Sequence, residues 1–196
     1  MIAQGNLLPY AGSRIAFFSN TLQAIAAGYL ISSLFILRLN VFTQLLCTIA
    51  LLLIYFIALY YIPVPGVGHA VLAPQQNLPL YIDKLLLGSF QDGTNYTWIL
   101  TSLGFAATVM TGVFASYILQ SGISQLGKLK ALSVTGLALV AAGLLLNPVQ
   151  LIIKHVWTTS FTLFSSVLCF LLLALFYLVF DFWKFQRGAF FFLVCG

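Results

Sequence analysis

Two ionisable residues, Lys154 and His155, stand side by side in a short segment between two long apolar stretches. An imidazole titrates near neutral pH, so it can accept or pass on a proton during a reaction. A lysine ammonium beside it can hold a carboxylate or a phosphate. The pair is therefore our candidate catalytic site. The alternative is that both residues anchor a helix end at the membrane surface beside Trp157, in an ordinary aromatic belt.

Asp83, Trp157, Gln23 and Asn20 are the candidates for binding a substrate. Asp83 precedes Lys84 in an apolar run with a helical rhythm, where its carboxylate can orient a catalytic group or bind an amino sugar. A salt bridge between these two residues at the surface is the competing interpretation. Asn20 and Gln23 lie one helical turn apart at the start of an apolar stretch, where amides line a cavity or hydrogen-bond between helices.

Several other kinds of site are not expected. The chain has two histidines, three acidic residues and three cysteines without CxxC spacing, so we predict no metal site. The sequence has no Ser-His-Asp order, Walker loop or dinucleotide-binding glycine motif. Its basic residues form no cluster, which argues against a nucleic-acid partner.

Composition indicates which elements must position these residues. Hydrophobic residues make up 62% of the chain and charged residues only 6%, whereas about a quarter of the residues in soluble domains are charged. A chain of this composition is solvated by membrane lipid. We therefore predict an all-α, multi-pass transmembrane helical bundle.

Five apolar stretches approach the roughly 20 residues that cross a bilayer, and they define one transmembrane domain over residues 1–196. The interval 63–96 is predicted to be an external loop, with a short interfacial helix over residues 80–88. The five predicted spans cover about 19–37, 41–62, 97–120, 129–147 and 158–180.

Alternation of the spans divides the basic residues between two faces. Positive residues accumulate in cytoplasmic loops, so the face with more of them is predicted to be cytoplasmic. The larger group is Arg38, Lys128, Lys130, Lys184 and Arg187, and the smaller group is Arg14, Lys84 and Lys154.

Small residues recur at helical spacing in three of the spans. Such stripes let helix backbones approach closely, which is how helices associate in lipid. We expect them at helix contacts, and a substrate groove along one of them is the alternative. The stripes are Ala24, Gly28 and Ser32; Gly104, Thr108, Gly112 and Ser116; and Ser133, Gly136 and Gly143.

Three ordered motifs resemble the heparan-alpha-glucosaminide N-acetyltransferase-like membrane proteins, in the variant found in Bacteroidetes. They are Ile62-Pro-Val-Pro-Gly-Val-Gly68, Asn77-Leu with Tyr81-Ile-Asp-Lys-Leu-Leu-Leu-Gly88, and Lys154-His-Val-Trp-Thr-Thr-Ser-Phe161. The resemblance covers nearly the whole chain. It implies a central-to-late segment of the family, following the region that holds the family's usual acetyl-carrying histidine.

The resemblance implies transfer of an acetyl group from cytoplasmic acetyl-CoA to an amino sugar on the far side of a bacterial inner membrane. Its implied partners are membrane lipid, the amino sugar and, as a further possibility, other copies of the chain. Two other functions stay open on the residues themselves. One is a transporter or permease for an amino sugar or related small molecule, and the other is a non-catalytic membrane scaffold.

Overall fold

The computed structural model describes residues 21–88 and 95–185, and within these ranges it is helical with no strand. Six α-helices and a closing π-helical segment account for the regular structure, so the predicted all-α class is confirmed. Their bounds are α1 Thr21–Arg38, α2 Val41–Tyr61, α3 Leu78–Leu87, α4 Ser102–Gln120, α5 Gln125–Leu146, α6 Thr159–Phe176 and η3 Tyr177–Phe182.

Five of these helices are long and apolar enough to cross a membrane: α1, α2, α4, α5 and α6 together with η3. The chain is therefore an integral membrane protein. The predicted spans agree with these helices except at two starts. α4 begins at Ser102 rather than near residue 97, because the preceding residues form turns. α5 begins at Gln125 rather than near residue 129, because the Ser124 hydroxyl caps it by accepting the Gly127 N–H over 3.2 Å.

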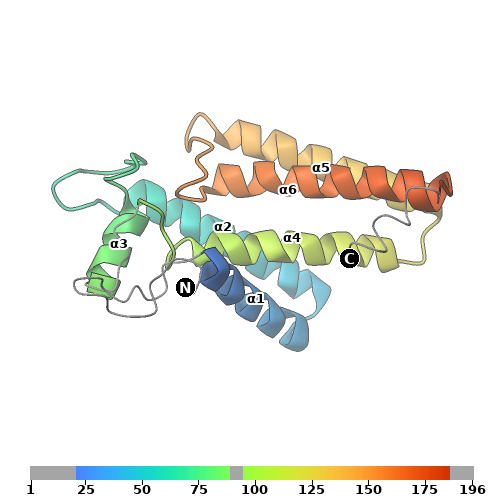
Figure 1. Ribbon diagram of the computed structural model, residues 1–196, viewed down its shortest axis with the longest axis horizontal. Coiled ribbons are helices and arrows are strands. Elements are labelled where there is room, and N and C mark those ends of the chain that lie inside the picture. The colour runs from blue at the N-terminus through green and yellow to red at the C-terminus, as the bar shows by residue number, and fades with distance from the viewer. Residues whose placement is uncertain (1–20, 89–94, 186–196) are drawn as a thin grey trace, which may run out of the picture.

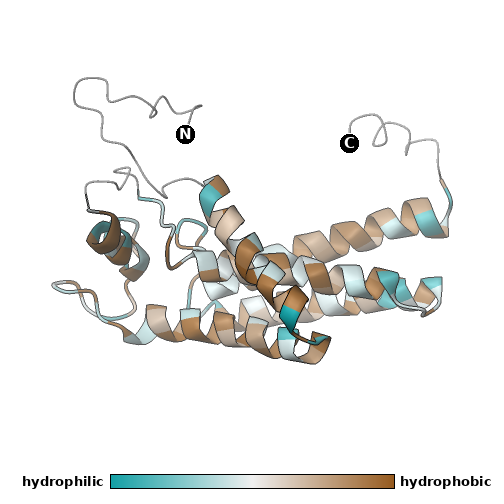
Figure 2. Cartoon of the chain, turned by 90° about the horizontal axis from the view of Figure 1, so that it is seen from below, coloured by the Kyte–Doolittle hydropathy of each residue, from teal (hydrophilic) through white to brown (hydrophobic). Residues whose placement is uncertain are grey.

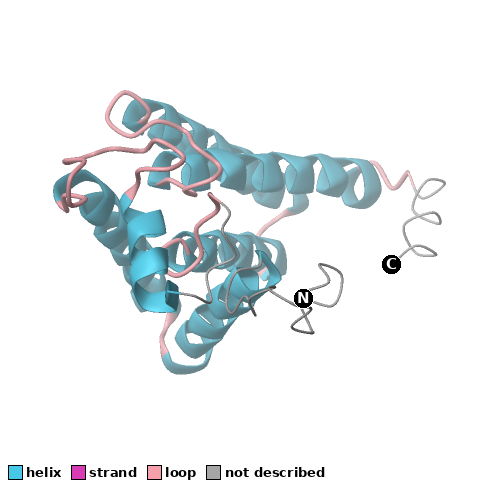
Figure 3. Cartoon of the chain, turned by 60° about the vertical axis from the view of Figure 1, so that its left-hand side comes forward, coloured by secondary structure: helices cyan, strands magenta, loops and turns pink. Residues whose placement is uncertain are grey.

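The long helices run along the molecule, and α3 lies across one end of them (Figure 1). We call this end the loop end. It gathers three connections that are far apart in the sequence, residues 62–77, 95–101 and 147–158, and Figure 3 shows these loops crowded together there. The predicted external loop and its short helix therefore lie beside the segment that carries Lys154 and His155.

Two of the three predicted small-residue stripes lie at helix contacts. Ala24, Gly28 and Ser32 are the buried residues of α1. A Cβ at Gly28 would stand 3.0 Å from the main-chain nitrogen of Ala106, so α1 and α4 touch through their backbones here. Gly136 and Gly143 likewise let α5 pack closely on α6, since a Cβ at Gly143 would stand 3.1 Å from the main-chain nitrogen of Phe164.

The outer surfaces of the long helices are apolar, as the brown faces of Figure 2 show. Leu37 and Leu145 are 77% and 78% exposed. Exposed leucines over several helices are expected where lipid is the solvent. The described basic residues fall at the two ends as predicted: Lys84 and Lys154 at the loop end, and Arg38, Lys128, Lys130 and Lys184 toward the other. Arg14 and Arg187 lie outside the described residues.

Candidate functional site

The segment between α5 and α6 turns back at Lys154 and His155. The Trp157 N–H donates to the Lys154 carbonyl oxygen over 3.1 Å, which closes a reverse turn. Lys154 and His155 are exposed on this turn, while Val156 is buried. Trp157 has a φ of 51°, a left-handed conformation that is uncommon for a bulky residue. Val156 packs in the apolar cluster of Tyr55, whereas Trp157 packs against Phe105.

Buried polar groups at the start of α6 fix the shape of this segment. The side-chain oxygen of Gln150 accepts the Thr159 N–H over 2.8 Å, and the Ser160 hydroxyl donates to the Gln150 carbonyl oxygen over 2.5 Å. The Thr158 hydroxyl donates to the Leu151 carbonyl oxygen over 2.8 Å. The two bonds to Gln150 are buried, where breaking such a bond is costly. The turn is therefore held as a defined structure.

Two side chains from other elements hold the turn from outside. The buried hydroxyl of Tyr55, on α2, donates to the main-chain oxygen of Val156. The hydroxyl of Thr97, just before α4, donates to the main-chain oxygen of His155 over 3.1 Å. These bonds place the backbone of this segment and do not use the side chains of Lys154 and His155.

The indole of Trp157 packs against the first turn of α4. Its ring lies 4.3 Å from the ring of Phe105 in a stacked arrangement, and its Nε1 donates to the Thr108 hydroxyl over 3.3 Å. Gly104 makes room for this packing, since a Cβ there would stand 2.8 Å from Cδ1 of Trp157. The small residue at position 104 therefore lets α4 approach both Trp157 and Thr162 at the start of α6.

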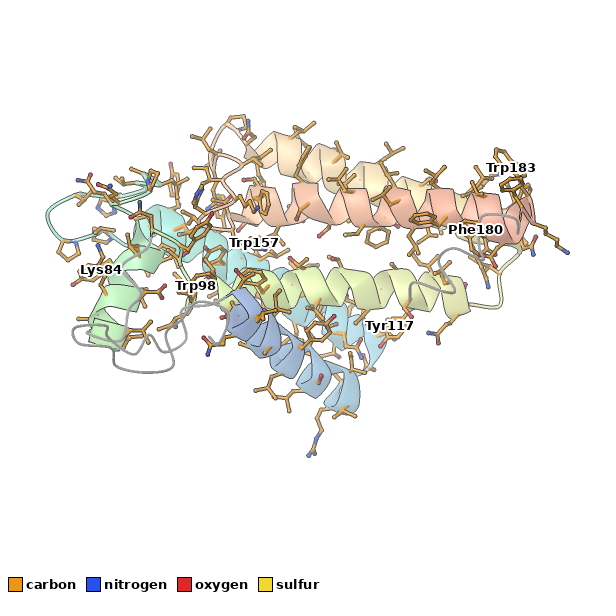
Figure 4. All side chains as sticks on the ribbon, in the orientation of Figure 1. Lys84, Trp98, Tyr117, Trp157, Phe180 and Trp183 are labelled. Atoms are coloured by element: carbon orange, nitrogen blue, oxygen red, sulfur yellow. The ribbon has the colours of Figure 1, made fainter. Side chains whose placement is uncertain are left out.

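These residues enclose a cavity of about 190 Å³, which we call the loop-end cavity. The ring of His155 stacks on Tyr96 with 4.8 Å between centroids. Trp98 and Trp157 come from different segments, and Figure 4 shows both toward the loop end, with Lys84 farther out on α3. The cavity is lined by Thr21, Tyr96, Thr97, Trp98, Phe105, Lys154, His155 and Trp157.

Asp83 takes a different position from the one predicted for a substrate contact. It is fully buried, and its two carboxylate oxygens accept the main-chain N–H groups of Trp98 and Ile99 over 2.7 and 3.0 Å. It is not among the residues that line the loop-end cavity. Asp83 therefore fixes the segment that carries Tyr96 and Trp98, one wall of the cavity. Its neighbour Lys84 is exposed.

Of the remaining predicted substrate contacts, the structure describes Gln23, which does not line the cavity. Gln23 is half-buried on the first turn of α1, and Asn20 lies outside the described residues. His69 is exposed, and its Nδ1 lies 2.9 Å from the Tyr61 carbonyl oxygen. Within residues 21–88 and 95–185, no three His, Cys, Asp or Glu side chains come together as metal ligands.

No protein-family model matches this chain, and neither a curated protein nor a solved structure matches it. The resemblance to the acetyltransferase-like family stays a prediction. The three motifs on which it is based are nonetheless brought together at the loop end, because residues 62–68, α3 with its start at Asn77, and residues 154–161 all adjoin there.

Sequence reasoning missed three residues that shape the site: Tyr55, Gln150 and Trp98. Tyr55 and Gln150 are polar groups within apolar stretches, a signal that often marks a buried hydrogen bond. Trp98 had no comparable signal, because its role depends on residues 154–157, far along the chain, which the fold brings to the same cavity.

Proposed function

We propose that this membrane chain carries the site of an acetyltransferase that acts on an amino sugar at the loop end. The proposal is based on the loop-end cavity, which is lined by the imidazole of His155 and the ammonium of Lys154. Three aromatic side chains line the same cavity: Tyr96, Trp98 and Trp157. Flat aromatic faces suit a sugar ring, and the two polar side chains suit acyl transfer to an amine.

In the proposed reaction the amine nitrogen of the sugar attacks the acetyl carbonyl carbon. A carbon–nitrogen bond forms, the bond from that carbon to the sulfur of acetyl-CoA breaks, and the thiol leaves. His155 takes the proton that the amine loses and passes it to the departing sulfur, which leaves as the thiol. Lys154 supplies positive charge beside the negative oxygen that develops on the carbonyl. A bacterial inner membrane is the proposed location.

The transporter alternative has less support. Transporter sites of this kind use helices that are broken by proline or glycine at the middle of the membrane. In the described ranges the prolines are at positions 63, 65, 74, 79 and 148, all outside the five long helices. A scaffold without a ligand gives no reason for polar side chains around an aromatic cavity.

The test is acetyl transfer by the chain in detergent solution, where labelled acetyl-CoA and glucosamine both reach the loop end. Uptake of labelled glucosamine is measured separately in proteoliposomes. His155→Gln removes the base, and we expect the rate to fall roughly a hundredfold or more. Lys154→Gln removes one charge-assisted contact, and we expect a fall of about tenfold. His69→Gln and Lys84→Gln are matched controls, since both side chains are exposed at the loop end and do not line the cavity.

Unchanged rates in both site variants would overturn the assignment of the site. Uptake of labelled glucosamine without acetylation would show that the chain is a transporter and not an acetyltransferase. A wild-type chain that neither acetylates nor transports the sugar would contradict the proposed function.

A further inference from the structure

A second cavity of about 510 Å³ runs from the loop-end cavity along the outside of the bundle, and we call it the groove. It lies between α1 and α4 within the membrane-spanning part of both helices. Both cavities are lined by Phe105 and Trp157, so they adjoin at this aromatic pair. The walls of the groove include Ile25 and Tyr29 of α1 and Val109, Gly112 and Val113 of α4.

The groove exists because α1 and α4 touch at one place and then diverge, as Figure 1 shows. At Gly28 the helices are in backbone contact, since a Cβ would stand 3.0 Å from atoms of Phe105 and Ala106. At Gly112, two turns further along α4, a Cβ would meet nothing within 4 Å. Thr108, Gly112 and Ser116 of the third predicted stripe thus line an open groove, whereas Gly104 packs against Trp157.

The loop-end cavity has features of a binding site for an anionic group. The described residues that line it include the cation Lys154 and no acidic side chain. Trp98 also lines it and is only 6% exposed, and its buried Nε1 has no hydrogen-bond partner among the described residues. Buried donors normally have a partner. An acceptor oxygen of a ligand in this cavity would supply one.

We propose that the loop-end cavity and the groove together hold one amphiphilic ligand, an anionic membrane lipid. Its phosphate lies near Lys154 and Trp98, and a hydrocarbon chain lies between α1 and α4. The groove is apolar and opens at the lipid-facing side of the bundle, where acyl chains are the surrounding solvent. The positive charge of Lys154 in the loop-end cavity favours an anionic lipid head group over a zwitterionic one. The phosphate would take the place that the proposed function gives to the amino sugar, so the lipid would compete with the sugar for this cavity. The test of lipid binding requires no acetyl donor.

The test is native mass spectrometry of the purified chain after incubation with equal amounts of phosphatidylglycerol and phosphatidylcholine. We expect one retained phosphatidylglycerol per chain, at about fivefold preference over phosphatidylcholine. Lys154→Gln should remove the preference, and Lys84→Gln should keep it. Gly112→Leu fills the groove from a position with open space, so it should abolish retention of the lipid. Val134→Leu is the control for added bulk, because Val134 is 65% exposed on α5 and does not line the groove.

Val109→Trp provides a second way to fill the groove should Gly112→Leu not fold. Equal retention of the two lipids by the wild-type chain would overturn the proposal, as would full preference in Lys154→Gln. Lipid retention by a folded groove-filling variant would also overturn it. A dimer that Gly112→Leu dissociates would show that a second copy occupies the groove, and the lipid proposal would then be wrong.

Discussion

The carboxylate of Asp83 on α3 accepts the main-chain N–H of Trp98 over 2.7 Å, and it joins the short helix of the loop end to the segment that leads into α4. Its other oxygen accepts the N–H of Ile99 over 3.0 Å. A carboxylate that receives two main-chain N–H groups near a helix start is placed where negative charge is favoured. The buried carboxylate of Asp83 therefore fixes the position of the segment that carries Tyr96 and Trp98, which line the loop-end cavity.

Asp83→Asn keeps the shape of the side chain but replaces one acceptor oxygen by an NH₂ group that faces an N–H donor. We expect a loss of about 2 kcal/mol in the free energy of unfolding, because hydrogen bonds to charged groups are the strong ones. Thermal unfolding in detergent measures it. Lys84→Gln, one residue along on the exposed face of α3, should leave the midpoint unchanged. Equal midpoints for Asp83→Asn and the wild type would contradict the role given to Asp83.

Tyr55→Phe removes the hydroxyl that donates to the Val156 carbonyl oxygen, and it leaves a buried acceptor without that partner. We expect a loss of about 1 kcal/mol, the range measured for hydrogen bonds inside membrane proteins. Hydrogen exchange of residues 150–157 should increase as the turn loosens. Tyr60→Phe is the matched control, since Tyr60 is 38% exposed on the same helix. Unchanged exchange in Tyr55→Phe would show that the turn does not depend on this bond.

Alanine substitutions at Gly28 and Gly112 test where α1 and α4 are in contact and where they diverge. Gly28→Ala forces a methyl group against the backbone of α4 at 3.0 Å, and overpacking of this kind costs about 1–3 kcal/mol. Gly112→Ala enters open space within a helix, so it should stabilise the chain by about 0.5–1 kcal/mol. Unfolding midpoints that move in opposite directions support this geometry. A shift of the same sign in both variants would contradict it.

Gly104→Ala places a methyl group 2.8 Å from Cδ1 of Trp157. We expect the indole to leave its stack on Phe105 and to lose the bond from its Nε1 to Thr108. Its fluorescence emission should then shift to longer wavelength as the ring becomes more exposed. Gly122→Ala, at a position where a Cβ meets nothing within 4 Å, should leave the spectrum unchanged. An unshifted spectrum in Gly104→Ala would mean that α4 moves instead of the tryptophan.

Hydropathy predicted the five long helices because each must satisfy its backbone hydrogen bonds within itself in lipid, whatever its neighbours are. The stripe of Ala24, Gly28 and Ser32 also predicted the buried face of α1, since close helix contact in lipid requires small side chains. The short helix α3 was expected from its apolar rhythm. Its start follows from Asn77, whose side-chain oxygen accepts the Leu80 N–H over 2.9 Å.

The sequence by itself therefore determined the class of the protein, its membrane-spanning helices and the gathering of three motifs on one side. These depend on local composition and on spacing along the chain. Only the tertiary structure decided that Asp83 is a buried support, that Trp98 and Trp157 enclose a cavity with His155, and that the stripe at Gly112 lines a groove. The reason is physical: each of these depends on segments far apart in the chain, whose distances follow from helix crossing and from the buried hydrogen bonds of Tyr55 and Asp83.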